Sequence, residues 1–264
     1  MSEVINNNIP SESSRPGNGW DALSGEIPFL GNEESLIDDE PAAESIVIED
    51  DQDHETVKNI EIYNLTPQDN LEQAAEAIYL TDQYICPDLF GDEERAKVLV
   101  GALFSEDPDV MFSYSKTLVA KDKDNNIAGI LVYRDSNCQP WDADAAKARY
   151  VATGIEMPQN FDRVNNIYMP KTTGEMAPGA AEIEFVGVRD DFLSQGIGKQ
   201  LTQSLASKPE YTELHLDVLD SHPWARKSYG NLGFEPDGEK FGNYPDASEG
   251  VQHMVLRKES NPHE

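Results

Sequence analysis

Cysteine is scarce in this sequence: 264 residues contain only Cys86 and Cys138. Their separation fits neither a disulfide framework nor a zinc-ligand spacing, so we expect free thiols and no metal site. Apolar runs are also short, and none approaches the roughly 18 residues that a membrane-spanning helix needs. The first residues, MSEVINNNIPSESS, lack the basic and apolar regions of a secretory signal. These absences favour a cytoplasmic protein that does not contact a membrane.

Basic residues are few as well. Lys and Arg together number 20 against 50 Asp and Glu, which gives a formal net charge of -30. A surface this negative repels phosphate backbones and anionic lipid heads, which argues against nucleic-acid and membrane partners. The same charge would attract a cationic acceptor such as an amine, or would serve solubility alone.

The composition divides the chain into three parts. Residues 1–58 are rich in Asn, Ser, Pro, Asp and Glu, and their apolar residues occur only in short clusters. Such a segment buries too little surface to offset the entropy lost on ordering, so we predict a disordered acidic tail. A globular pattern then runs over residues 59–258 and predicts one folded domain. Residues 259–264 form a short C-terminal tail.

The first half of the globular part predicts a strand, two helices and a β-hairpin, from the spacing of apolar residues. Thr66-Pro67 is predicted to open the first helix, because Thr caps free amides and Pro fits the first helical turn. Asp92 precedes the second helix. The predicted strands lie at 60–65, 117–122 and 127–134.

The second half begins with a long connection at 135–180, which carries Trp141, Tyr150, Phe161 and Tyr168. A connection of this length is expected to hold structure or function, such as a lid over an acceptor site. A strand, a helix and a strand follow with tight links, which predicts parallel neighbours joined by a right-handed crossover. The remaining pattern predicts a helix and two strands. These elements lie at 181–188, 196–207, 212–219, 223–232, from 234 onward and at 251–257.

Two sequence segments carry the chemistry. The first, VRDDFLSQGIGKQL (188–201), places Gly196 and Gly198 between a strand and a helix, where backbone amides converge on a phosphate. Alone this pair is a weak signal, because Leu201 stands where a dinucleotide fingerprint needs a small residue and no Walker pattern is present. The second segment, LHLDVLDSHPWARKSYGNLGFE (214–235), follows at a fixed distance.

Together the segments resemble the GCN5-related N-acetyltransferase superfamily. Its cofactor motif is Arg or Gln, two residues, Gly, one residue, then Gly or Ala, and Gly196 and Gly198 match the small residues. Its second motif is met by Ala225, Tyr229 and Leu232-Gly233-Phe234. The resemblance is strong over 181–235 and extends through element order to 59–258.

The resemblance implies an α/β fold with a mixed, mostly antiparallel sheet, whose central parallel strand pair splays around the cofactor, and with helices on both faces. It implies acetyl-CoA as co-substrate and direct acetyl transfer to a primary amine, on a small molecule or on a protein, by a monomer or homodimer. The cofactor contacts that it implies are Val186, Gly187, Val188, Ser194, Gln195, Gly196, Ile197, Gly198, Lys199, His222, Ala225 and Tyr229. Gly187 would suit a β-bulge, or it would allow close packing.

Two positions depart from the family pattern. Leu193 occupies the Arg or Gln position, so a side-chain contact to the pyrophosphate is missing. A hydrogen bond to a charged group contributes roughly 1.5 to 3 kcal/mol, so affinity falls about tenfold or more unless Lys199 or Arg189 substitutes. His222 stands where the family usually has Asn.

Acetyl transfer to an amine needs a base for the ammonium proton and an acid for the departing thiolate. Tyr229 matches the family's acid. Base candidates are Glu182 and Glu184, which share one face of their strand, and Asp217 on the next strand. His215 and His253 are weaker candidates and read more readily as structural residues.

The alternative is a non-catalytic acyl-CoA-binding or interaction module with the same fold. Leu193 and the acidic tail favour this alternative, whereas Tyr229 with a carboxylate nearby favours an enzyme.

Overall fold

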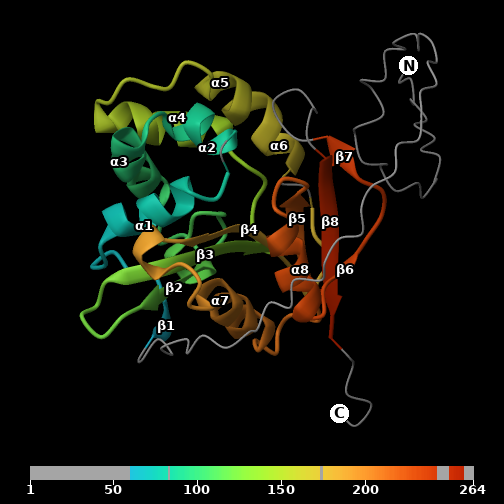
Figure 1. Cartoon of the computed structure of the whole chain (residues 1–264). Coiled ribbons are helices and arrows are strands. Elements are labelled where there is room, and N and C mark those ends of the chain that lie inside the picture. The colour runs from blue at the N-terminus through green and yellow to red at the C-terminus, as the bar shows by residue number, and fades with distance from the viewer. Residues whose placement is uncertain (1–59, 83, 173–174, 243–249, 259–264) are drawn as a thin grey trace, which may run out of the picture. The chain divides into compact units, whose positions relative to one another are not determined.

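A computed structural model describes residues 60–82, 84–172, 175–242 and 250–258, all within one compact unit (Figure 1). The predicted tails at 1–58 and 259–264 lie outside the described residues. Within the described ranges, no helix is both long and apolar enough to span a bilayer.

The described residues form one sheet of eight strands, in the order β1-β2-β3-β4-β5-β8-β6, with β7 also paired to β8. Neighbouring strands are antiparallel except for β4 and β5, which are parallel. The strands are β1 (Glu61–Asn64), β2 (Thr117–Lys121), β3 (Ile127–Asp135), β4 (Ala180–Val188), β5 (Glu213–Leu219), β6 (Glu235–Pro236), β7 (Phe241–Gly242) and β8 (Gly250–Arg257).

Helices cover both faces of this sheet (Figure 1). Because side chains alternate along a strand, Val119 of β2 joins the core under α1 to α4, and its neighbour Leu118 joins a second core under α7 and α8. The predicted fold class is thereby confirmed. The longer helices are α1 (Leu71–Tyr79), α2 (Ile85–Phe90), α3 (Glu93–Leu103), α4 (Ala143–Thr153), α7 (Ile197–Ala206) and α8 (Pro223–Asn231), and the short ones are η1 (Tyr114–Lys116), α5 (Phe161–Arg163), η2 (Val164–Tyr168), α6 (Met169–Thr172) and η3 (Asp190–Phe192).

The start of α1 differs from the prediction. Asn70 is the N-cap, and its side-chain oxygen accepts the amides of the first helical turn. Thr66 instead donates its amide and hydroxyl to the Asp69 carboxylate, at 2.8 and 2.9 Å, so Thr66-Pro67 lies in a turn that precedes the helix. The prediction was wrong because Thr66 acts as a donor to a nearby carboxylate here, and not as the acceptor that a cap requires. As predicted, α3 follows Asp92, whose side chain caps the helix by accepting the amide of Arg95 at 2.9 Å.

The long connection folds into α4, α5, the π-helical turn η2 and α6. Tyr150 and Phe161 are fully buried in the first core, and their tilted rings meet with centroids 4.7 Å apart. Trp141 donates its indole N–H to Asn165 at 2.9 Å, which ties the residues before α4 to η2. These contacts hold the segment together, and its helices pack against α2 and α3.

The β4–β5 pair is short. It joins Ala180–Ile183 to Glu213–Leu216, and beyond these residues the two strands are no longer paired. On its other side β4 stays paired to β3 as far as Val188, with a register shift that leaves Glu184 without a partner in β3. The bulge therefore lies at Glu184 and not at Gly187.

Gly187 allows close packing instead, because α1 crosses β4 at this residue. A Cβ on Gly187 would lie only 1.8 Å from the carbonyl oxygen of Ala77 in α1. Backbone cannot yield as a flexible side chain does, so this position admits only glycine. The contact fixes α1 over the second half of β4.

Replacing Gly187 by alanine should therefore destabilise the fold. We expect Gly187→Ala to lower the free energy of unfolding by about 3 kcal/mol, measured by urea denaturation, because α1 must move away from β4. Gly101→Ala in α3 is the matched control. Its Cβ would meet only Leu71 carbons, at 3.8 and 3.9 Å, and removing a helical glycine should stabilise the protein by about 0.5 to 1 kcal/mol. Equal stability of Gly187→Ala and the unmodified protein would contradict this packing.

Candidate functional site

A cleft of about 770 Å³ opens where β4 and β5 part. Its walls are β4 from Glu182 onward, β5 from Leu216 onward, the loop before α7, the first turn of α7 and one side of α8. The segment between α1 and α2 and, from the long connection, Tyr168 and Met169 complete them. Every residue predicted from the sequence to be catalytic or cofactor-binding lies on these walls: Glu182, Glu184, Val186, Gly187, Val188, Ser194, Gln195, Gly196, Ile197, Gly198, Lys199, Asp217, His222, Ala225 and Tyr229.

The loop before α7 presents backbone amides to the cleft. Ser194 and Gly196 have positive φ values of 63° and 72°, and Gly196 is the N-cap of α7 without a side-chain hydrogen bond. The amides of the first helical turn therefore lack a side-chain acceptor from the cap, and the first turn contains no acidic residue. Such a helix start is suited to an anion, through its amides and the helix dipole.

Few side chains near the start of α7 are available to bind an anion. Leu193 is 53% exposed on the cleft wall and offers no donor. Arg189, a possible substitute, is occupied elsewhere: its Nε contacts Glu76 of α1 at 2.8 Å, and a second nitrogen donates to the Ile127 carbonyl at 3.1 Å. Lys199 remains on the cleft wall and forms no ion pair within the described residues.

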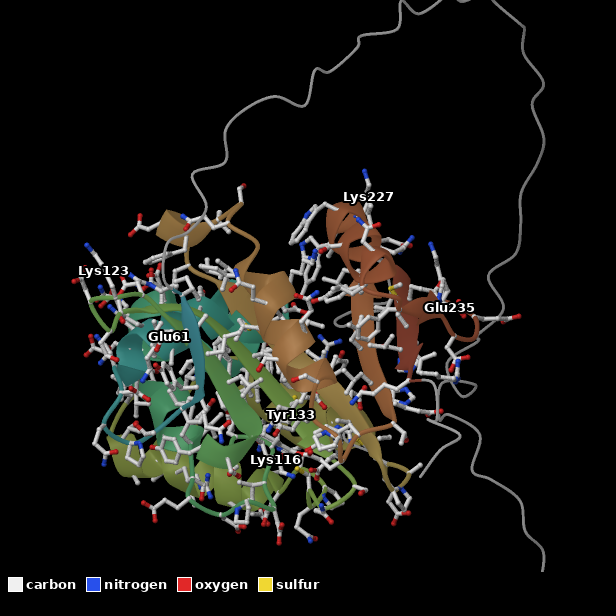
Figure 2. All side chains as sticks on the ribbon, turned by 90° about the horizontal axis from the view of Figure 1, so that it is seen from below. Glu61, Lys116, Lys123, Tyr133, Lys227 and Glu235 are labelled. Atoms are coloured by element: carbon white, nitrogen blue, oxygen red, sulfur yellow. The ribbon has the colours of Figure 1, made fainter. Side chains whose placement is uncertain are left out.

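The facing wall comes from α8. Lys227 points outward from this helix (Figure 2). Ala225 and Tyr229 pack against the second core. The Tyr229 ring meets Phe234 edge-on, with centroids 5.7 Å apart. Burial raises the pKa of Tyr229 to about 12, so its hydroxyl stays protonated at neutral pH and is able to donate. Trp224, at the start of α8, is 70% exposed at the rim of the cleft.

Both glutamates of β4 are bound to one arginine. Arg134 of β3 pairs through Nε with Glu184, at 2.5 Å, and through a terminal nitrogen with Glu182. Burial raises the pKa of both carboxyl groups, and their mutual repulsion adds to the effect at Glu184, while Arg134 opposes it. The sequence analysis missed Arg134. The available signal was an arginine within a wholly buried strand, which requires a carboxylate partner.

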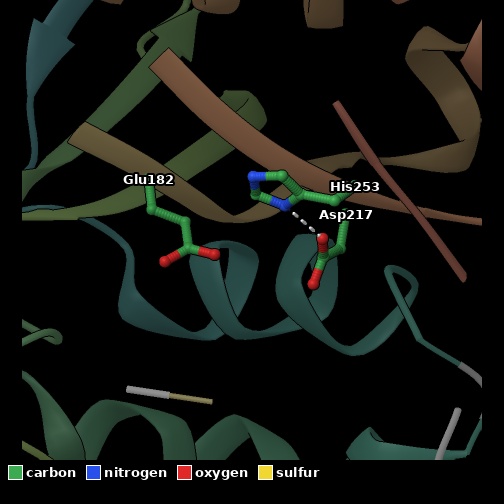
Figure 3. Close-up of side chains that lie close together, drawn as sticks. All are labelled: Glu182, Asp217 and His253. Carbon is green, nitrogen blue, oxygen red and sulfur yellow. Dashed lines mark hydrogen bonds and ion pairs between the residues drawn. The ribbon is translucent and has the colours of Figure 1, made fainter. Parts of the chain in front are cut away.

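Asp217 belongs to a different group. In the β5–β8 ladder it lies directly opposite His253, and its carboxylate contacts His253 Nδ1 at 2.8 Å (Figure 3). His253 Nε2 lies 3.1 Å from Nδ1 of His215, whose Nε2 lies 3.4 Å from Glu213. The hydrogen bond to Asp217 raises the pKa of His253, whereas burial lowers the pKa of His215.

One atom each from Glu182, Asp217 and His253 lies within 4.8 Å of the others, which is close enough for a metal ion (Figure 3). The residues fit a cation poorly, because Glu182 already accepts from Arg134, whose positive charge would repel it. His253 Nδ1, the nitrogen that faces this point, is bonded to Asp217. The arrangement is an ion cluster satisfied by its own hydrogen bonds.

Comparison with known proteins identifies the fold. No protein-family model and no curated protein matches the chain. A solved acetyltransferase structure is similar to this chain with 20% identity and a TM-score of 0.52, and the alignment covers 75% of this chain and 100% of the acetyltransferase chain. An N-acetyltransferase structure from Staphylococcus aureus Mu50 is similar with 17% identity and a TM-score of 0.52, and the alignment covers 74% of this chain and 100% of the other. The chain has the fold of these two acetyltransferase structures.

Proposed function

We propose that this protein is an N-acetyltransferase that moves an acetyl group directly from acetyl-CoA to a primary amine. The observation that carries the proposal is the cleft between the parted strands. One cleft holds free strand backbone, the amides of a helix start, a protonated tyrosine and carboxylates. These are the groups that a thioester, its pyrophosphate and an amine acceptor need.

The cofactor would lie along the cleft with its pyrophosphate at the start of α7. The extended pantetheine arm would bond to the backbone of Val186–Val188, which the loss of pairing with β5 leaves open on this side. Backbone recognition of this kind does not depend on side-chain identity. It explains how the site tolerates Leu193 in place of a basic or amide side chain.

Transfer then needs one proton removed and one delivered. The neutral amine attacks the thioester carbonyl, the C–S bond breaks, and Tyr229 donates its hydroxyl proton to the departing thiolate. The nitrogen of the new amide then gives up its surplus proton, which restores the Tyr229 hydroxyl. Because burial raises the pKa of Tyr229 to about 12, its hydroxyl carries this proton at neutral pH. No covalent enzyme intermediate is required.

The acceptor end of the cleft favours a cation. Asp82, Glu182, Glu184 and Asp217 line it, and Arg134 offsets part of their charge. An ammonium group is attracted to such a site, and an anionic acceptor is repelled. Small amines and protein amino groups both satisfy this requirement.

A non-catalytic acyl-CoA-binding module is the second candidate, and the exposed Leu193 is the observation that favours it. A thiol-release assay with acetyl-CoA and pooled amines and peptides, combined with calorimetry, separates the two. We expect acetyl-CoA binding and release of CoA with at least one amine pool. Binding without release would favour the module, and no binding at millimolar acetyl-CoA would end both proposals.

Removing the hydroxyl of Tyr229 tests the acid. Tyr229→Phe should lower kcat by about 100-fold, the scale of general acid catalysis, and change the Kd of acetyl-CoA by less than about twofold. Steady-state kinetics and calorimetry measure the two effects. Tyr63→Phe is the matched control, because Tyr63 is half exposed on β1, outside the cleft. An unchanged kcat in Tyr229→Phe would remove this residue from the acid role.

Restoring the missing basic side chain tests the cofactor loop. Leu193→Arg should tighten acetyl-CoA binding about tenfold, because one charge-assisted hydrogen bond contributes roughly 1.5 kcal/mol or more. Val151→Arg controls for the added charge, since Val151 is 61% exposed on α4 and does not line the cleft. Affinity that is no tighter than that of the unmodified protein would place the pyrophosphate elsewhere.

A further inference from the structure

Four side chains on β5 and β8 form a continuous chain of contacts from the cleft. Asp217 meets His253 at 2.8 Å, His253 meets His215 at 3.1 Å, and His215 meets Glu213 at 3.4 Å. The two imidazole rings stack with centroids 5.3 Å apart. Only Asp217 of the four lines the cleft.

This chain is short of one proton when both histidines are neutral. Each of its three contacts needs one proton, and two neutral imidazoles supply only two. His215 is the member that stays neutral, because burial and the neighbouring His253 lower its pKa. We assign its proton to Nε2, the nitrogen nearest the Glu213 carboxylate, and in this tautomer its Nδ1 accepts from His253 Nε2.

This arrangement of hydrogen bonds leaves one nitrogen of His253 as the atom that titrates. In this tautomer, Nε2 of His253 keeps its proton because it donates to His215. The proton that His253 gains or loses is therefore the one on Nδ1, which faces Asp217. When this proton is absent, the Nδ1 lone pair and the Asp217 carboxylate face each other. A proton arriving at Asp217 from the cleft therefore has a second acceptor 2.8 Å away.

The two glutamates of the cleft are less suited to receive it. Glu182 and Glu184 are both held by Arg134, at side-chain exposures of 17% and 13%, so their oxygens are already used as acceptors. Asp217 is more open, at 41%, and its only ion-pair partner within the described residues is His253.

We propose that Asp217 and His253 together act as the base of the transfer reaction, with His215 as the positioning residue that fixes the tautomer. The inference rests on the proposed function. The acceptor ammonium loses one proton to the Asp217 carboxylate, and this proton moves to Nδ1 of His253. The amine becomes neutral, its lone pair attacks the thioester, and the pair ends as an aspartate beside an imidazolium. The proton returns to solvent through Asp217 after the acetylated product leaves.

The charges around His253 fit this role. Asp217 on β5, Glu182 on β4 and Asp237 after β6 all favour its protonated form, burial opposes it, and the adjacent His215 has a lowered pKa of its own. The pKa of His253 is therefore raised from its ordinary value of 6.5. Because the base must be unprotonated, the rate should rise with pH through the raised pKa and level off above it.

Kinetics with the full chain test the pair. We expect His253→Gln to lower kcat by about 100-fold or more with the KM for acetyl-CoA nearly unchanged, and to remove the acidic limb of the pH–rate profile. Asp217→Asn should lower kcat and move any remaining limb to lower pH. Asp237→Asn is the matched control: it removes a charge near His253 outside the cleft, and its plateau rate should stay within about twofold. An acidic limb that persists in His253→Gln would overturn the proposal.

Nitrogen-15 NMR of the histidines separates this proposal from the proposed function. We expect His253 to titrate above 6.5 and its neutral form to carry the proton on Nε2, and we expect Asp217→Asn to lower its pKa. A neutral form protonated on Nδ1 would overturn the pair as a base, even in an active enzyme. If the unmodified protein transfers no acetyl group, the proposed function fails. The role of Asp217 and His253 in transfer then fails as well, whichever tautomer the NMR shows.

An assay with a metal chelator completes the test. Activity and the His253 titration should be unchanged by a chelator. Activity lost on chelation and restored by zinc ions would make Glu182, Asp217 and His253 ligands, and would overturn the proposed base.

Discussion

The parting of β4 and β5 is the constraint on which the site depends. The two strands pair only as far as Ile183 and Leu216, yet each stays in the sheet because its other neighbour, β3 or β8, remains bonded along its length. Backbone groups on the facing sides of the two strands lose their partners, and such groups need water or a ligand in exchange. The parting thus creates the cavity and also the donors and acceptors that line it.

Packing on the first face of the sheet holds this geometry in place. The bulge at Glu184 changes the course of β4, and the contact between Gly187 and Ala77 fixes α1 against the strand's second half. On the other face, Ile197 and Leu201 of α7 are buried in the second core, so the amides at the start of this helix are held at the cleft. Helix amides and Lys199 line the cleft from α7, and Glu182, Glu184 and Asp217 line it from β4 and β5.

The sequence predicted the fold class and the cleft walls well because these depend on local patterns. The glycine loop, Ala225 and Tyr229 keep fixed spacings within continuous elements, and the fold brings them to one cavity. Arg134 and His253 were missed or set aside because their importance depends on strand neighbours. The ladder that sets His253 opposite Asp217 joins residues that are distant in sequence. Asn70 was missed as a cap because Thr66-Pro67 is the stronger local pattern for a helix start. In the structure, Thr66 donates to Asp69, and Thr66-Pro67 forms a turn before the helix.

The most direct test of this account is a crystal structure of the protein with CoA. We expect the pantetheine arm between the second halves of β4 and β5, hydrogen-bonded to the backbone of Val186–Val188. The pyrophosphate should lie on the amides of Gly196–Lys199 and the sulfur near the Tyr229 hydroxyl. CoA bound outside this cleft, or β4 and β5 paired along their full length in the complex, would contradict the account.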